Sequence, residues 1–245
     1  MEDAPTIDVQ VYPDPESLAS AFASATADAL RAALEGEPRA TLCLTGGSTP
    51  APAYRQLAAM DLEWDRIHLF WTDERLVPPD TPESNYRMAY ETLLEPAGVP
   101  ETNVHRMRGE LGKHEAAEDY ESQLHQFFGE EPVSFDVLHL GMGADGHVAS
   151  LFPGAHELDE FDRWAVPARA PAGTAVRQRL TLTFPALDSA RLALVAAAGE
   201  AKREAFLDVV EAYETGSLAP PPIARVRPAG PLVWMIDQAL AQGVE

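Results

Sequence analysis

Asp145 and His147 stand two residues apart in a glycine-rich segment, and together they could move protons in a reaction. An imidazole changes its charge near neutral pH, which suits a general base, and a neighbouring carboxylate can orient it. Gly143 and Gly146 lie beside the pair and allow positive φ angles and a close approach of the backbone to a ligand. The segment follows the apolar stretch 135–140, which we predict to be a strand buried on both faces, and the ends of such strands bind ligands. The pattern therefore predicts a catalytic loop.

Two other interpretations of this loop remain open. Residues 141–146 satisfy G-x-G-x-x-G, the pattern of a dinucleotide-binding turn. That turn usually opens a full helix at the first strand of its fold, whereas Pro153 limits any helix here to about two turns. The loop could also be a tight turn that places a histidine on the surface without a chemical role. The catalytic interpretation is favoured because a carboxylate and an imidazole share one turn at a strand end.

A second polar loop lies between a predicted strand, 40–44, and a predicted helix, 51–60, and reads Thr45-Gly46-Gly47-Ser48-Thr49-Pro50. This order of strand, glycine-rich turn, hydroxyls and helix is typical of an anion site made from backbone N–H groups at a helix N-terminus. The lysine of a Walker loop is absent, and Pro50 stands where a nucleophile elbow needs glycine. We therefore interpret Ser48 as a ligand-binding hydroxyl. A plain Ser/Thr cap of the helix is a compatible alternative.

Two further polar clusters follow predicted strands. Residues 72–75, Thr-Asp-Glu-Arg, come after the predicted strand 67–71, although charges in such a place can also form an ordinary solvated loop. Gly199 and Lys202 come after the predicted strand 192–197 and begin a helix, which repeats the arrangement of the second loop. Both clusters therefore lie at strand ends, where an open α/β sheet binds its ligands.

The composition limits the partners of the chain. Among its 245 residues, 39 are acidic and 18 are basic, which gives a formal net charge of −21. This field repels nucleic acid and anionic membrane surfaces, so an anionic substrate would need a local pocket of positive charge. No stretch approaches 18 apolar residues and the acidic N-terminus has no leader-like pattern, so we expect a soluble cytoplasmic protein. Cys43 is the only cysteine, and its apolar neighbours predict a buried, inert thiol.

Predicted strands alternate with predicted helices throughout the chain. This alternation predicts an α/β fold: a doubly wound, mainly parallel Rossmann-like sheet with helices on both faces. A chain of this length can form one large domain, so we expect residues 1–245 to be a single domain. The remaining predicted strands are 7–11, 164–168, 179–184 and 232–236, and the remaining predicted helices are 15–33, 84–94, 113–128 and 200–213.

Six motifs resemble, in order, those of the 6-phosphogluconolactonase family, and they span essentially the whole chain. They are Leu44-Thr45-Gly46-Gly47-Ser48-Thr49-Pro50, Thr72-Asp73-Glu74-Arg75, Ser84-Asn85-Tyr86, the stretch 141–153 around Asp145-Gly146-His147, Arg179-Leu180-Thr181-Leu182-Thr183, and Gly199-x-x-Lys202. The resemblance implies the hydrolysis of 6-phospho-D-glucono-1,5-lactone in the oxidative pentose phosphate pathway, by a carboxylic ester hydrolase without a metal or an organic cofactor. The partner it implies is this small lactone, and both a monomer and a homodimer are compatible with it.

The resemblance also implies roles for individual residues. His147 would be the general base that activates water, and Asp145 would orient or tune it. The residues implied to line the sugar-phosphate site are Gly46, Gly47, Ser48 and Thr49. The residues implied to supply positive charge are Arg75, Arg179 and Lys202. The resemblance leaves open which of these cations meets the phosphate and which meets the oxyanion.

Two relatives of this family provide alternative functions. Glucosamine-6-phosphate deaminases have a similar loop that ends in Asn-Glu-Pro-Gly, whereas this chain has Leu151-Phe152-Pro153-Gly154 and lacks that acidic residue. Sugar-phosphate-sensing regulators use the fold for binding alone and have a DNA-binding module ahead of it, whereas the first predicted strand here starts at Ile7. Catalysis by a metal is not predicted, because residues 114–118 lack the second histidine of H-E-x-x-H.

The acidic composition predicts that salt stabilises the protein. Only Lys113 and Lys202 are lysines, and counterions should screen the self-repulsion that opposes the folded state. We expect the midpoint of thermal unfolding to rise between low and molar KCl. A midpoint that stays level or falls contradicts this expectation.

Overall fold

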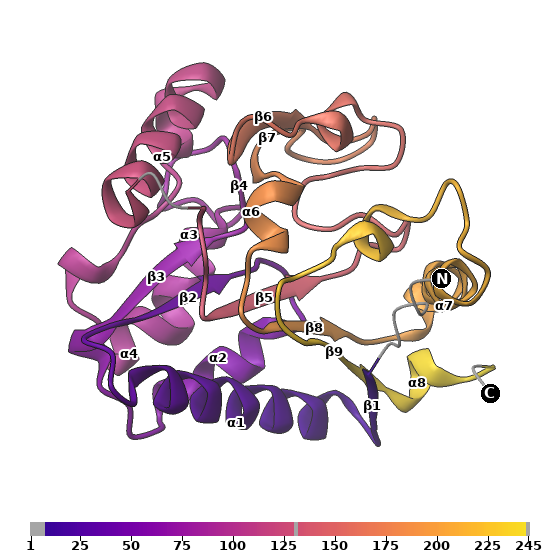
Figure 1. Cartoon of the computed structure of the whole chain (residues 1–245), viewed down its shortest axis with the longest axis horizontal. Helices are drawn as coiled ribbons and strands as arrows, with labels where there is room; N and C mark the ends of the chain where they lie inside the picture. The colour runs from indigo at the N-terminus through magenta and orange to yellow at the C-terminus, as the bar shows by residue number, and fades with distance from the viewer. Residues whose placement is uncertain (1–7, 130–131, 244–245) are drawn as a thin grey trace.

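Six parallel strands form the central sheet of the molecule, in the spatial order β1-β9-β8-β5-β2-β3 (Figure 1). The computed structural model describes residues 8–129 and 132–243, so Ile7 and the N-terminal segment 1–6 lie outside the described residues. The strands of this sheet are β1 (Asp8–Tyr12), β2 (Ala40–Leu44), β3 (Ile67–Trp71), β5 (Val137–Gly141), β8 (Ala193–Ala197) and β9 (Leu232–Asp237). Strands β2 and β8 are buried at every position, as expected for apolar strands that are covered on both faces.

Five of the α-helices in the described residues begin within a few residues of a predicted helix, whereas the short helices Glu95–Ala97, Phe184–Asp188 and Gln238–Ala241 were not predicted. In chain order, the α-helices are α1 (Pro15–Leu34), α2 (Pro50–Ala58), α3 (Asn85–Ala89), α4 (Glu95–Ala97), α5 (Lys113–Phe128), α6 (Phe184–Asp188), α7 (Arg203–Thr215) and α8 (Gln238–Ala241). Two of the expected caps are present: the Asp14 carboxylate accepts a hydrogen bond from the backbone N–H of Ser17, and the Ser84 hydroxyl accepts one from Arg87. The expected helix 84–94 begins as α3 and continues as a π-helical turn, Tyr90–Leu94. None of the helices in the described part of the chain could span a bilayer.

Helices cover both faces of the central sheet, which confirms the predicted doubly wound architecture. On one face, Phe22 of α1 contacts His139 of β5, with ring centroids 4.5 Å apart. On the other face, Phe206 of α7 contacts Trp234 of β9 at 5.3 Å. The pairing of β8 with β5 and β9 places Leu194 beside His139 but Val195 beside Trp234, so the two contacts lie on opposite faces.

Three strands form a separate antiparallel sheet in the order β4-β7-β6, a feature that the sequence did not predict. They are β4 (Asp73–Arg75), β6 (Ala165–Arg169) and β7 (Gln178–Leu182). The cluster 72–75 was expected at a strand end as a polar loop, but Asp73–Arg75 pairs with residues 179–181 of β7. Strand β7 ends at Leu182, before the predicted boundary at 184, because α6 begins at Phe184. Pro185 lies in the first turn of this helix, where proline is tolerated.

His139 is a titratable group inside the core. Its Nε2 lies 2.8 Å from the hydroxyl oxygen of Thr26, and the side chain is fully buried. Burial lowers the pKa of His139 to about 3, because the charged imidazolium would lose its hydration. Cys43 is also buried and free, as predicted.

The lowered pKa of His139 predicts a loss of stability in acid. In the unfolded chain an imidazole takes up its proton near pH ~6.5, whereas His139 in the folded chain stays neutral down to about pH 3. The free energy of unfolding should therefore fall as pH decreases through this window. At pH 5 this single group accounts for a loss of about 2 kcal/mol relative to pH 7.

Urea unfolding of His139→Gln at pH 7 and pH 5 tests this prediction. The variant should lose less stability between the two pH values than the parent. The exposed His114, replaced by Gln in the same way, should leave the pH dependence unchanged. Equal pH dependence in the parent and in His139→Gln contradicts the assignment.

Candidate active site

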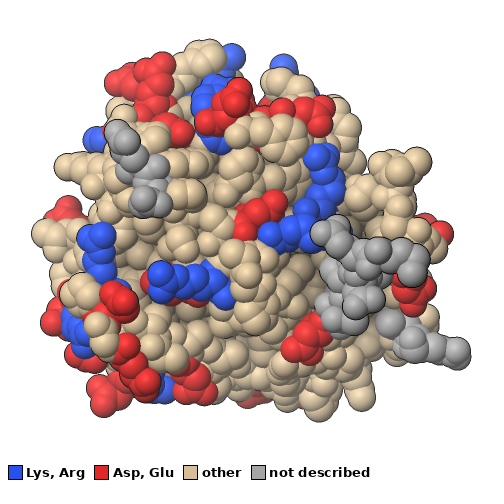
Figure 2. Space-filling model, in the orientation of Figure 1, with Lys and Arg blue, Asp and Glu red and all other residues tan. Residues whose placement is uncertain are grey.

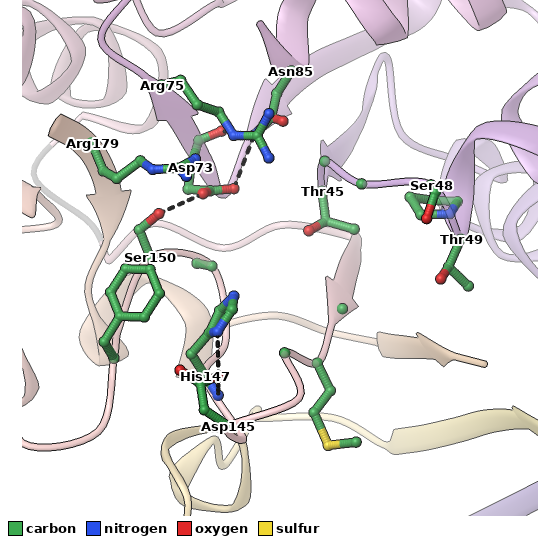
Figure 3. Close-up of a pocket in the computed structure, with 18 of the residues that line it drawn as sticks. Thr45, Ser48, Thr49, Asp73, Arg75, Asn85, Asp145, His147, Ser150 and Arg179 are labelled. Atoms are coloured by element: carbon green, nitrogen blue, oxygen red, sulfur yellow. Dashed lines mark hydrogen bonds and ion pairs between the residues drawn. The ribbon is translucent and has the colours of Figure 1, made fainter. Parts of the chain in front are cut away.

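A cavity of about 480 Å³ opens at the carboxyl ends of the parallel strands (Figure 3). It is lined by the loops that follow β2, β5 and β8, by β4 and β7 of the small sheet, and by α3. All nine residues that the sequence analysis assigned to the site line this one cavity: Gly46, Gly47, Ser48, Thr49, Arg75, Asp145, His147, Arg179 and Lys202. The structure thus brings together side chains that come from five separate segments of the chain.

His147 is held by Asp145 in the loop that follows β5. Its Nδ1 lies 2.5 Å from Oδ1 of Asp145, and the backbone N–H of His147 donates to the same oxygen at 3.2 Å. Because the carboxylate accepts the proton on Nδ1, the other ring nitrogen, Nε2, has its lone pair free. The imidazole is about one third exposed and points into the cavity in Figure 3. The hydrogen bond from His147 holds the pKa of the Asp145 carboxyl below its ordinary value, so this carboxyl stays ionised.

Two glycines make this arrangement sterically feasible. A Cβ on Gly143 would overlap the ring of His147 and the carboxylate of Asp145. Gly146 has a φ of +77°, and its carbonyl accepts a hydrogen bond from the N–H of Ile223 at 3.1 Å. Phe152 contacts the imidazole, with ring centroids 4.6 Å apart, and so limits its rotation. The side chain of His147 therefore has a defined orientation.

The loop between β2 and α2 has the form of an anion site. The backbone N–H groups of Gly46, Gly47 and Ser48 have no hydrogen-bond partner within the part of the chain that the structure describes. Thr49 stands at the cap position of α2 but makes no capping bond through its side chain, so it is not a conventional cap. The hydroxyl of Tyr54 accepts from the N–H and donates to the C=O of Thr45, at 3.1 and 3.0 Å, which fixes the start of the loop. Free N–H groups at a helix N-terminus attract an anion.

Arg75 and Arg179 are neighbours in the small sheet, where they form one cross-strand pair. Arg179 is only 8% exposed, and the Nε atoms of both side chains are buried without a hydrogen-bond partner. Among residues 8–129 and 132–243, neither guanidinium forms an ion pair. Burial lowers the pKa of Arg179, although the charge of Asp73 opposes this effect. Two like charges held together and unpaired favour the binding of an anion.

Lys202 adds a third cation to the cavity wall from the turn that follows β8. The buried carboxylate of Asp237 accepts hydrogen bonds from the N–H of Gly199 at 3.0 Å and from the N–H of Leu240 at 2.9 Å, so it fixes the turn that holds the lysine. Burial lowers the pKa of Lys202, and the negative charge of Asp237 opposes this effect.

Sequence reasoning missed several residues of the cavity. Asp73, Asn85 and Ser150 line it, although all three stood inside the quoted motifs, and Pro171 and Thr174 reach it from the hairpin between β6 and β7. Asn85 fills the space beside Gly46, where a Cβ would overlap its amide. Nothing in the local spacing of these residues indicated that they would meet.

The cluster 72–75 contributes to the cavity only in part. Asp73 and Arg75 face it, whereas the intervening Glu74 turns away because side chains alternate along β4. The Glu74 carboxylate is buried and accepts hydrogen bonds from the N–H groups of Asn85 and Tyr86, at 2.7 and 2.8 Å, so it holds the start of α3. Burial raises the pKa of Glu74, and these hydrogen bonds oppose that shift.

The cations of the cavity contrast with the charge of the molecule as a whole. Most Asp and Glu side chains lie toward the margin of the face in Figure 2, and one acidic group lies near its centre beside a patch of Lys and Arg. The formal net charge is −21, so an anion approaches a repulsive surface before it meets Arg75, Arg179 and Lys202. In the described part of the chain, no group of three or more His, Cys, Asp and Glu side chains is arranged to hold a metal ion.

Comparisons with known proteins show the family of the chain. The family model "Glucosamine-6-phosphate isomerases/6-phosphogluconolactonase" matches residues 13–234. A 6-phosphogluconolactonase of Nostoc sp. is 37% identical over 94% of this chain and 95% of its own length, and that of Homo sapiens is 36% identical over 96% and 92%. The solved structure of 6-phosphogluconolactonase from Trypanosoma brucei superposes with a TM-score of 0.88 at 26% identity, and covers 98% of this chain and 99% of that one. The chain therefore belongs to the glucosamine-6-phosphate isomerase/6-phosphogluconolactonase family.

Proposed function

We propose that this protein hydrolyses 6-phospho-D-glucono-1,5-lactone to 6-phospho-D-gluconate, the lactonase step of the oxidative pentose phosphate pathway. The observation that carries the proposal is an imidazole fixed by a carboxylate in a cavity whose walls hold unpaired cations. Relatives named 6-phosphogluconolactonase, similar along almost the whole chain, support the same reaction. The substrate has a phosphate that the cations can bind, and its lactone ester requires a general base for hydrolysis.

In the proposed mechanism, Nε2 of His147 removes a proton from a water molecule as the oxygen of that water attacks the lactone carbonyl carbon. Asp145 keeps the proton on Nδ1 and stabilises the imidazolium that forms. The tetrahedral oxyanion then collapses, the bond from the carbonyl carbon to the ring oxygen breaks, and the imidazolium returns its proton to that oxygen. The product is a hydroxy acid, and His147 is neutral again.

The cavity offers two separate sets of anion-binding groups near His147. In Figure 3, Ser48 and Thr49 lie to the right of His147, and Arg75 and Arg179 lie above it. A sugar-phosphate lactone has a phosphate at one end and a carbonyl that becomes an oxyanion at the other, so it requires binding groups at both ends. Binding energy from the phosphate end would hold the carbonyl beside Nε2 of His147.

A coupled assay tests the proposed substrate. The purified protein receives freshly made 6-phosphogluconolactone in one series and glucosamine 6-phosphate in another. We expect acceleration of lactone opening above its spontaneous rate and no release of ammonia. Turnover of the amino sugar without lactone hydrolysis would reject the proposal in favour of the deaminase.

The role of His147 predicts a loss of turnover without a loss of fold. His147→Ala should reduce kcat by about 10²- to 10⁴-fold, which is typical for removal of a general base. Because the side chain is partly exposed, the midpoint of thermal unfolding should stay near that of the parent. Parent kcat/KM should also fall in acid, since a protonated imidazole cannot accept a proton from water.

The control for this prediction is His114→Ala, which removes an exposed histidine outside the cavity and should leave kcat unchanged. Chelators should not affect the parent, because the proposed nucleophile is water activated by imidazole. Near-parental turnover by a folded His147→Ala, after subtraction of spontaneous hydrolysis, rejects His147 as the base.

Arg75, Arg179 and Lys202 should act through the charge of the substrate. Neutralising any one of them should lower kcat/KM for the phosphorylated lactone by about 10- to 100-fold, the range of a lost charge-assisted hydrogen bond. Glucono-1,5-lactone has no phosphate, so its hydrolysis should suffer less. Steady-state kinetics of Arg179→Gln on the two lactones provide the measurement.

Arg177→Gln is a matched control, because it removes the same charge just before β7 at a residue that does not line the active cavity. It should leave the preference for the phosphorylated lactone unchanged. Equal losses of kcat/KM on both lactones in Arg179→Gln would assign this arginine to the carbonyl end or to the fold.

A further inference from the structure

We propose that Ser150 and Asp73 are positioning residues that fasten the end of the catalytic loop to the small sheet and thereby place His147. The hydroxyl of Ser150 donates a 2.6 Å hydrogen bond to Oδ2 of Asp73, and both residues line the cavity (Figure 3). The proposal rests on the proposed lactonase function for its kinetic test. Amide hydrogen exchange tests it independently of that function.

Ser150 is bound at two points, so its place is well defined. Besides the bond from its hydroxyl, its backbone N–H donates to the hydroxyl oxygen of Thr181 at 3.0 Å. Thr181 gives its own proton to the C=O of Leu182, also at 3.0 Å, which leaves its oxygen free to accept. Asp73 and Thr181 are paired across β4 and β7, so one position of the small sheet supplies both acceptors.

The conformation of the residue before Ser150 explains why such a fastening is needed. Ala149 has a φ of +50°, and it is the only residue other than glycine with a positive φ in the described ranges. This conformation is unfavourable for a residue with a Cβ, and it persists where surrounding contacts determine it. The two hydrogen bonds of Ser150 supply those contacts directly after the strained residue. Without them the loop can relax, and His147 stands only two residues before Ala149.

Asp73 connects the catalytic loop to the anion loop. Its Oδ1 accepts a 3.1 Å hydrogen bond from Nδ2 of Asn85, and the same nitrogen donates to the backbone C=O of Asp73 at 2.9 Å. Asn85 in turn fills the space next to Gly46. The resulting path, Gly46 to Asn85 to Asp73 to Ser150, joins the loops that hold the anion site and the proposed base. It sets the distance at which a bound substrate would present its carbonyl to His147.

The geometry of Asp73 favours positioning over proton transfer. Both of its carboxylate oxygens accept hydrogen bonds from buried donors, Ser150 and Asn85. A carboxylate engaged in this way is held in one orientation. A misplacement of reacting groups by about 1 Å can lower the rate by about 10²-fold, so fastening alone accounts for a large effect on turnover.

Ser150→Ala and Ser84→Ala form a matched pair of variants. Both serines are buried, and each donates its hydroxyl to a carboxylate of β4: Ser150 to Asp73, and Ser84 to Glu74 at 3.0 Å. Ser84 holds the start of α3 and does not line the cavity. We expect both variants to lose thermal stability. Only Ser150→Ala should lose kcat on the phosphorylated lactone, by about 10- to 100-fold. Its KM should change by less than about threefold, because the anion loop and the cations remain.

A second variant covers the case in which Ser150→Ala does not fold. Thr181→Val keeps the shape of the side chain but removes the acceptor for the N–H of Ser150, whereas Thr181→Ser keeps that acceptor. Thr181→Val should lose kcat with little change in KM, and Thr181→Ser should retain it. Unchanged kcat in the folded Ser150→Ala and Thr181→Val variants, or an equal loss in Ser84→Ala, overturns the proposal.

Amide hydrogen exchange separates this proposal from the proposed function. Residues 142–152 should exchange faster in Ser150→Ala than in the parent or in Ser84→Ala, whatever the substrate is. Faster exchange of residues 142–152 in Ser150→Ala, together with a parent that does not hydrolyse the lactone, would support the positioning role of Ser150 and reject the lactonase function. Unchanged exchange in this segment beside an active parent would reject the fastening and retain the function.

Discussion

The hydrogen bond between Asp145 and Nδ1 of His147 is the interaction on which the site depends, because it decides which ring nitrogen faces the cavity. It forms only where the chain turns sharply without side chains in the way, a condition that Gly143 meets. The turn follows directly after β5, and this strand is a rigid support because it is buried on both faces. The central sheet therefore positions the proposed base through one loop and one hydrogen bond.

Much of the site could be predicted from the sequence because its parts are local. The turn around His147 and the glycine-rich loop at Gly46 each lie within a few residues of an apolar strand, and strand ends meet at one edge of a parallel sheet. The contact between Ser150 and Asp73 joins residues 77 positions apart, so no spacing rule indicates it. The strand Asp73–Arg75 was missed for a similar reason: three polar residues show no period, and they form a strand only because β7 lies beside them.

The cavity also contains an unfavourable interaction between two positive charges. Arg75 and Arg179 stand side by side and neither forms an ion pair among the described residues, so their mutual repulsion opposes folding. Buried strands and well-bonded loops around them provide the stability that tolerates this repulsion. The chain as a whole is strongly acidic, whereas three cations line this one cavity.

The cavity is lined by residues from two structural units, the central sheet and the separate three-stranded sheet. The central sheet supplies the proposed base, and the small sheet supplies two arginines together with Pro171 and Thr174 from an exposed hairpin. Exposed hairpins accept insertions and sequence changes far more readily than buried parallel strands do. Substitutions confined to the hairpin between β6 and β7 should therefore change the shape of the cavity wall while the loop that holds Asp145 and His147 stays the same.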